Sequence, residues 1–359
     1  MNILKATREY EVWLARQTPI VVSDLRKKHR LMAKSPFLFL RATFYRWIQL
    51  WPEACADLTR APRVLGVGDL HLENFGTWRD TDGRLVWGIN DFDEADQYAY
   101  TLDLVRLATS AVLAAREEHL ALRSRDIAGA ILEGYLAGMR SGGRPFVLAE
   151  DHTWLLEIAQ SKPRDPVRFW NNIDRLPLAR TVPRNARDAI EQLLPQRDLP
   201  CRIARRSSGL GSLGRMRFVA ITQWHGGRLA REAKALVPSS ANWLDQRVPR
   251  QPRYSDLLAR SVRCPDPLVR CVGPWIVRRL SPDCSKIELD SLRAGRNEIR
   301  LLQAMGREIA NIHLGTARQR KNILKDIAKR KGNWLRQAAE AMVLATQKDW
   351  RVWRENQEG

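Results

Sequence analysis

The sequence is most informative at Gly68-Asp69-Leu70-His71-Leu72-Glu73-Asn74-Phe75-Gly76, where an Asp and an Asn stand five residues apart. The apolar run before it predicts a strand that enters a loop. A turn and a second apolar strand, Leu85 to Ile89, follow and lead directly into Asn90-Asp91-Phe92-Asp93. Asp and Asn often cap turns, so either motif alone is weak. Together they predict hard oxygen ligands for a cation.

Charge is distributed unevenly along the 359 residues, whose formal net charge is +20. The window 61–103 contains nine acidic residues and only three arginines, whereas the window 201–218 contains five arginines and no acidic residue. An acidic window in a basic protein predicts a cation site. A basic window that carries glycines predicts an anion site.

Composition excludes several classes of protein. A hydrophobic content of 44% is normal for a folded chain, and the length suggests two or three domains or subdomains. No apolar run approaches the roughly 18 residues of a membrane helix. The amino terminus is charged from Lys5 onward, unlike a secretory signal, and five scattered cysteines without C-x-x-C predict neither a zinc site nor a disulfide framework. We expect a cytoplasmic protein.

The periodicity of apolar residues predicts an α+β protein. Helices are expected over most of residues 1–60, over much of 101–194, and again at 296–314 and 319–354. Strands are expected at 216–224 and 275–280, with a shorter one at 287–289. We therefore expect four parts: an N-terminal helical segment that docks on the core (1–60), a helical lobe that carries both acidic motifs (61–200), a β-rich lobe that carries the glycines of the basic window (201–290), and C-terminal helices that complete the helical lobe (291–359).

The basic window contains Gly209-Leu210-Gly211-Ser212-Leu213-Gly214. A strand follows this G-x-G-x-x-G, whereas a dinucleotide-binding fold would place a helix there. The pattern favours a glycine loop that covers nucleotide phosphates through Gly209, Gly211, Ser212 and Gly214, and a Gly-rich hairpin is the alternative. Arg231 or Lys234 could then pair with the phosphates, unless both are solvated charges at the start of a surface helix.

The two acidic motifs resemble the catalytic loop and the metal-binding Asp of kinase-like phosphotransferases, and G-D-x-H-x-x-N is closer to aminoglycoside and choline phosphotransferases than to H-R-D protein kinases. The resemblance implies ATP and Mg²⁺ as cofactors, with Asp69 as the catalytic base or hydroxyl orienter. It implies Asn74 and Asp91 as metal ligands; Asp93 is either a further ligand or a cap. Asp103 would brace the catalytic loop, although the residue pattern alone suggests a helix N-cap.

The order of these motifs is rotated relative to ordinary kinase-like folds, in which the glycine loop and its lysine come first. This order resembles an uncharacterised bacterial family, domain of unknown function 2252. The family pattern has K-E-A where this chain has Arg231-Glu232-Ala233. The resemblance implies a circularly permuted, protein-kinase-like two-lobe fold with a mostly helical larger lobe and a small β-rich lobe. Gly306–His313 resembles the helix that leads into the H-G-D loop of small-molecule phosphotransferases. The stretches that carry the resemblance to the bacterial family are Ser35–Arg41, Gly68–Gly76, Asn90–Glu94, Asp103–Ser110, Gly209–Gly214 and Val277–Lys286.

Three functions follow as hypotheses. The first is an ATP- and Mg²⁺-dependent phosphotransferase whose hydroxyl acceptor, small molecules included, the sequence does not identify. The second, motivated by Arg231, is a catalytically weak, pseudokinase-like nucleotide-binding protein. The third, motivated by the net charge, is a nucleic-acid-binding protein, which is less favoured because no zinc finger, RNP pattern or clear helix-turn-helix accompanies the charge. Arg278 and Lys286 are further candidates for anion contacts, or simply surface charges.

Overall fold

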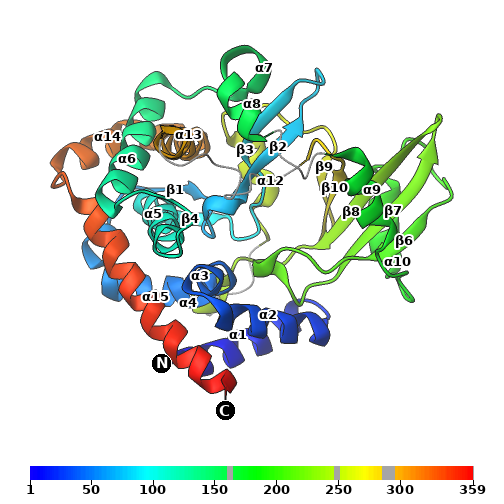
Figure 1. Cartoon of the computed structure of the whole chain (residues 1–359), viewed down its shortest axis with the longest axis horizontal. Helices are drawn as coiled ribbons and strands as arrows, with labels where there is room; N and C mark the ends of the chain where they lie inside the picture. The colour runs from blue at the N-terminus through cyan, green and yellow to red at the C-terminus, as the bar shows by residue number, and fades with distance from the viewer. Residues whose placement is uncertain (160–164, 246–250, 285–295, 359) are drawn as a thin grey trace.

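The computed structural model describes residues 1–159, 165–245, 251–284 and 296–358. Helices form most of one side of the molecule and a five-stranded sheet extends from the other side (Figure 1). The mixture of helix and strand confirms the expected α+β class. The strand expected at 287–289 and the anion candidate Lys286 lie outside the described residues.

Four helices form the amino-terminal segment, and two are capped by side chains that the sequence supplies. The side chain of Asn2 accepts a hydrogen bond from the Lys5 amide, and Ser35 accepts one from Leu38, with Pro36 in the first turn. The long helix α15 (Trp334–Glu358) packs against all of them. The four helices are α1 (Ile3–Gln17), α2 (Val22–Lys34), α3 (Pro36–Ala42) and α4 (Phe44–Ala54).

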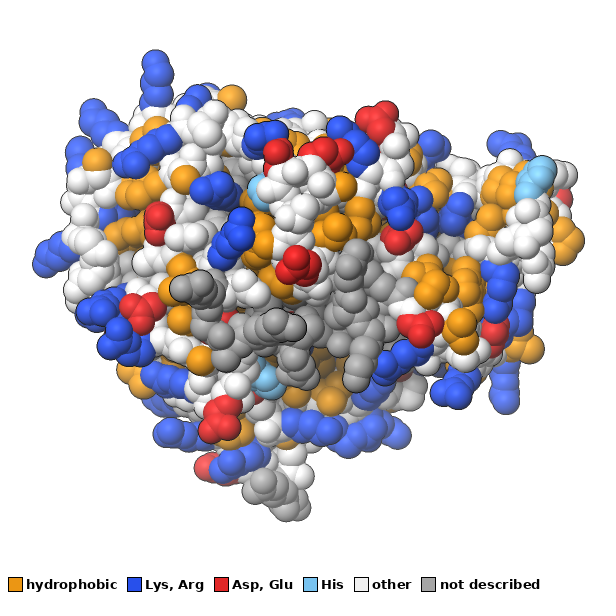
Figure 2. Space-filling view, turned by 45° about the horizontal axis from the view of Figure 1, so that its top comes forward, with side chains coloured by type: hydrophobic (Ala, Val, Ile, Leu, Met, Phe, Trp, Pro, Cys, Tyr) orange, Lys and Arg blue, Asp and Glu red, His pale blue; other side chains and the backbone are white. Residues whose placement is uncertain are grey.

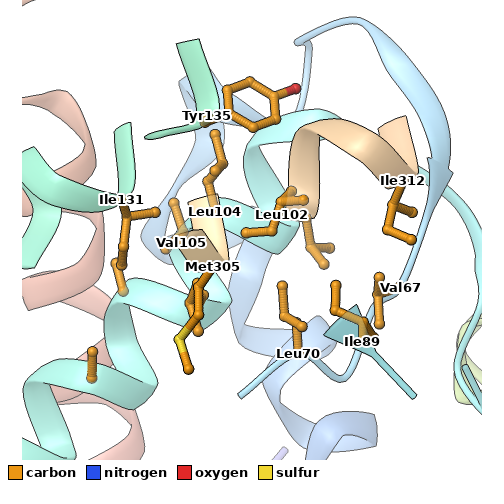
Figure 3. Packing of buried hydrophobic residues seen from close by; sticks show 14 of the residues in the cluster. Val67, Leu70, Ile89, Leu102, Leu104, Val105, Ile131, Tyr135, Met305 and Ile312 are labelled. Atoms are coloured by element: carbon orange, nitrogen blue, oxygen red, sulfur yellow. The ribbon is translucent and has the colours of Figure 1, made fainter. Parts of the chain in front are cut away.

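The main core surrounds α5 (Tyr100–Arg116), which is buried on all sides from Tyr100 to Ala114. Helices α6 (Ser124–Ser141) and α13 (Arg296–His313) approach each other closely at Gly134. A Cβ at this position would lie only 1.9 Å from the Gln303 carbonyl oxygen, so the close approach requires glycine. Figure 3 shows Val67, Leu70 and Ile89 in the same core as Leu102 and Ile312. The loops that carry the acidic motifs are therefore anchored in the core on both sides.

Two small antiparallel sheets position the acidic motifs. Strand β1 (Arg63–Gly66) pairs with β4 (Asp96–Ala99), and β3 (Leu85–Ile89) lies between β2 (Phe75–Arg79) and β5 (Phe146–Val147). Asp69 therefore follows the end of β1, and Asp91 follows the end of β3. Further helices outside the large sheet are α7 (Leu148–Asp151), α8 (Thr153–Ala159), α11 (Ser240–Asp245), α12 (Tyr254–Arg260) and α14 (Arg320–Lys329).

The large antiparallel sheet has the strand order β6-β7-β8-β10-β9. Helices α9 (Pro166–Asp174) and α10 (Arg184–Glu191) lie beside it rather than with the other helices (Figure 1). The apolar cluster of this part of the molecule thus includes residues before 200. Among the described residues, no helix combines the length and the apolar character that crossing a membrane requires. The strands are β6 (Arg202–Arg205), β7 (Arg217–Trp224), β8 (Gly227–Ala235), β9 (Val269–Val272) and β10 (Trp275–Leu280).

Candidate active site

The loop that carries Asp69 is fixed by Asp103 in the first turn of α5. The carboxylate of Asp103 accepts hydrogen bonds from the amides of Val67, at 2.8 Å, and Gly68, at 2.9 Å. His313 at the end of α13 lies 3.0 Å from the same carboxylate. The N-cap of α5 is Ala99, so Asp103 braces the loop and does not cap the helix.

Asp69 lies at the surface of the core, with 19% of its side chain exposed. The guanidinium of Arg106, which is completely buried in α5, donates a 2.6 Å hydrogen bond to Asp69 Oδ1 and another to the carbonyl oxygen of Leu40. Burial raises the pKa of the Asp69 carboxyl, and Arg106 opposes this rise. Arg106 thus orients the carboxylate and favours its charged form.

Asn74 connects the two acidic motifs. Its amide nitrogen donates to the backbone carbonyls of Asp69, at 3.0 Å, and Asp91, at 3.3 Å. Glu308 of α13 supports the second motif from behind by accepting a hydrogen bond from the Ile89 amide. Asp69, Asn74 and Asp91 are therefore brought together, and the amide oxygen of Asn74 takes no part in these bonds.

The acidic motif after β3 is paired with cations from the large sheet and the segment before it. Lys234 Nζ lies 3.1 Å from Asp91 Oδ1 and 2.6 Å from Asp93 Oδ1. Arg215 lies 3.2 Å from Asp93 and 3.6 Å from Glu94. Burial raises the pKa of Glu94 to about 7, although Arg215 opposes the shift. Asp93 thus pairs with both Lys234 and Arg215, whereas Asp91, which pairs with Lys234, is 28% exposed.

The glycine segment, residues 209–214, forms a turn over Asp69. A Cβ on Gly211 would lie 3.2 Å from Asp69 Oδ2. Helix α2 and the residues before it fix the end of this segment, because the Val21 amide donates to the Gly214 carbonyl at 2.8 Å and Leu25 packs against Gly214. Lys28 of α2 also donates to the Gly211 carbonyl at 3.5 Å. The amino-terminal helices therefore take part in the site.

Two neighbouring cavities meet at the glycine segment. The smaller, of about 50 Å³, is lined by Asp69, Asn74, Asp91 and Asp93 together with Gly209, Gly211 and Ser212. The larger, of about 390 Å³, extends from Asp91 and Gly209 along the face of the large sheet. Asp91 and Gly209 line both cavities, so a ligand in the larger one would reach the acidic motifs.

Two of the residues expected at the site face elsewhere. Arg231 lies on the face of β8 opposite to Lys234, and its guanidinium donates to the backbone carbonyl oxygens of Leu193 and Ala230. Gly214 faces Leu25 of α2. Neither Arg231 nor Lys234 is a solvated charge at the start of a helix, since both are buried within β8.

Several residues of the site were not expected from the sequence. Arg106 could have been noticed in the sequence, because it is the one basic residue between Tyr100 and Leu113 in a helix that is mostly apolar. Lys28 stands in a run of basic residues and nothing distinguishes it from its neighbours. Arg215 belongs to a segment whose pairing depends on tertiary structure, so no local pattern marks it.

The residues at the junction of the cavities fit a magnesium ion. Among the described residues no group of three or more His, Cys, Asp or Glu side chains could hold a metal by itself. Magnesium, however, commonly takes one or two carboxylates and completes its shell with water and phosphate oxygens. The Asp91 carboxylate and the Asn74 amide oxygen are donors of the required type beside a cavity large enough for phosphates.

The segment with both acidic motifs also matches a family model. Residues 21–163 match the model of a family described as "Uncharacterized protein conserved in bacteria (DUF2252)". The DUF2252 match supports the resemblance drawn from the motifs over the part of the chain from the start of α2 to beyond α8. It includes Asp69, Asn74, Asp91 and Asp93 and ends before the glycine segment and Lys234. No curated protein and no solved structure matches the chain.

Proposed function

We propose that this chain is an ATP- and Mg²⁺-dependent phosphotransferase with a circularly permuted, kinase-like two-lobe fold. The observation that carries the proposal is the convergence of Asp69, Asn74 and Asp91 beneath a glycine segment that follows them by more than a hundred residues. This convergence lies at the border of a cavity of about 390 Å³. This convergence supports the proposal because catalysis of phosphoryl transfer depends on positioning and charge.

The proposed roles follow from the contacts of each residue. Asp69 orients the acceptor hydroxyl and takes up its proton, and Arg106 fixes the carboxylate for that purpose. Asp91 and Asn74 would hold Mg²⁺, which when bound neutralises charge on the phosphate oxygens. Asp103 and His313 keep the Asp69 loop in place. The backbone amides of the glycine segment cover the phosphates.

The pairing of Lys234 favours a second candidate, a nucleotide-binding protein with little or no turnover. Its ammonium is already engaged by Asp91 and Asp93, and Arg106 is engaged by Asp69. A site whose carboxylates are already compensated has less affinity for a divalent cation. The nucleic-acid hypothesis is less favoured, because Figure 2 shows Lys and Arg side chains spread over the visible face rather than gathered in one stripe.

The test is ATP consumption with Mg²⁺ in the presence of a panel of hydroxyl acceptors. Asp69→Asn and Asp91→Asn should each reduce turnover by at least 100-fold, in the range typical of lost acid–base or metal contacts. Asp82→Asn, in the exposed turn between β2 and β3, is the matched control and should retain activity. Full activity of both site variants would refute the mechanism. ATP binding without turnover on any acceptor would favour the second candidate.

A further inference from the structure

Glu232 in β8 is completely buried and forms ion pairs with three arginines. Its carboxylate lies 2.6 Å from Arg206, 3.1 Å from Arg217 and 2.7 Å from Arg278. Burial alone would raise the pKa of Glu232, but the three guanidinium groups hold it well below its usual range. One negative charge therefore orients three positive charges, and the cluster has a surplus of two.

All three arginines line the cavity of about 390 Å³. Arg217 is buried and donates a 2.7 Å hydrogen bond to Ser212 Oγ, which connects the cluster to the glycine segment. The side chains of Arg206 and Arg278 are 27% and 24% exposed. Because one carboxylate cannot satisfy all their N–H groups, these two side chains keep donors for a ligand in the cavity.

The other arginines of the cavity are engaged elsewhere. Arg41 pairs with Glu73 at 2.7 Å and Arg279 pairs with Asp266 at 3.3 Å. Arg263 lies over the rings of Trp78 and Phe92 and donates to a backbone carbonyl. The described lining contains six arginines and three acidic residues, so it carries an excess of positive charge, and the cluster around Glu232 contributes a surplus of two to it.

The lining of the same cavity also has an apolar and aromatic part. Trp78, Phe92, Tyr254 and Leu258 contribute to the lining, and the ring of Tyr254 packs edge-on against Phe92. A ligand that fits both parts has a flat, poorly hydrated group and a multiply charged anionic group. A nucleoside di- or triphosphate has this chemistry.

We propose that Arg206 and Arg278, oriented by Glu232, hold the phosphate groups of the nucleotide. Lys234 is then a positioning residue for Asp91 and Asp93, and it does not take the phosphate-binding role of a kinase lysine. Arginine suits this role because its planar guanidinium can donate two hydrogen bonds to one phosphate. The proposal deepens the proposed function and depends on it only for the identity of the nucleotide.

Calorimetric binding of ATP and of inorganic triphosphate tests the proposal without any turnover. Arg206→Gln and Arg278→Gln each leave Glu232 with two arginine partners, so both variants should fold, which circular dichroism and thermal unfolding can verify. Each should weaken the binding of both probes by about tenfold, the equivalent of one charge-assisted hydrogen bond. Arg228→Gln is the matched control, because Arg228 lies in β8, the strand that carries Glu232, but pairs with Asp174.

The outcomes separate this inference from the proposed function. Weaker triphosphate binding by the two site variants, with an unchanged Arg228→Gln control, supports the arginine site even if the wild-type protein transfers no phosphate. Unchanged binding in both site variants overturns it even if the enzyme is active. Equal weakening in all three variants, or no binding of either probe by the wild-type protein, also overturns it.

Discussion

Lys234 and Asp91 face each other across 3.1 Å although 143 residues separate them in the sequence. The same ammonium reaches Asp93, so one side chain of the large sheet pairs with both aspartates that follow β3. Only 3% of the Lys234 side chain is exposed. This contact joins the sheet to the helical part of the molecule at the candidate site.

Lys234→Met should destabilise the protein by about 3 kcal/mol, because it leaves Asp93 with a single cation and Asp91 without its ammonium in a poorly solvated place. Urea unfolding measures the loss. Lys325→Met, at an exposed position of α14, should change the unfolding free energy by less than about 0.5 kcal/mol. Equal stabilities of the two variants would show that the contact contributes nothing.

Arg106→Met should raise the pKa of Asp69 further, since Arg106 is what opposes the effect of burial. Carboxyl-carbon NMR of the labelled protein can follow the titration of Asp69 directly, independent of any activity. Arg116→Met, at the exposed end of the same helix, should leave that titration unchanged. The orienting role of Arg106 is wrong if the two variants titrate alike.

Gly214→Ala and Gly226→Ala form a matched pair that tests the contact between α2 and the glycine segment. Both glycines have positive φ, +99° and +77°, so each substitution costs about 1 kcal/mol from the backbone alone. A Cβ on Gly214 would also lie 2.5 Å from Leu25, whereas Gly226 has open space. Gly214→Ala should therefore cost about 2 kcal/mol more in urea unfolding.

A second substitution, Leu25→Ala, should recover part of the additional loss in the Gly214→Ala background by removing the clash. If the double variant is less stable by the full sum of the two single losses, the two sites do not interact.

The pH dependence of stability should carry a contribution from Glu308. Burial raises its pKa to about 7 from 4.5, although Arg263 opposes the rise. Between these values the folded protein binds more protons than the unfolded chain, so this contribution falls as pH rises from 4.5 to 7 and is constant above. The difference in unfolding free energy between wild type and Glu308→Gln should decline by up to about 1.4 kcal/mol per pH unit. A difference independent of pH would contradict the shifted pKa.

The acidic motifs could be predicted because their geometry is local. Asp69 and Asp91 each follow a short apolar strand, and the two strands are close in sequence, so little tertiary information is needed to bring them together. Asp103 was also within reach, as a charged residue at the start of an apolar helix. The sequence could not decide whether Asp103 caps the helix or braces the Asp69 loop, because a residue in or next to the first turn can do either.

The sheet side of the site was less predictable. Arg231 and Lys234 stand in a run of Ala, Arg, Glu and Lys that suits a helix, but pairing with β7 and β10 makes it a strand. In a strand, successive residues face opposite sides of the sheet. Arg231 and Lys234 are three residues apart, so their side chains lie on opposite faces. Only one of them can reach Asp91, and neighbouring strands determine which.

The support of β1 and β3 by α13 sets the order in which the site can be completed during synthesis. The ribosome makes Asp69 and Asp91 early, but Glu308 follows the Ile89 amide by 219 residues and His313 follows Asp103 by 210. Until α13 has been made, the nascent acidic motifs lack two of the side chains that support them, Glu308 and His313. The carboxy-terminal third therefore supplies contacts that support the acidic motifs of the amino-terminal third. A shortened chain that ends after the large sheet would keep Asp69, Asp91 and Asp93 but would lack the contacts of Glu308 and His313.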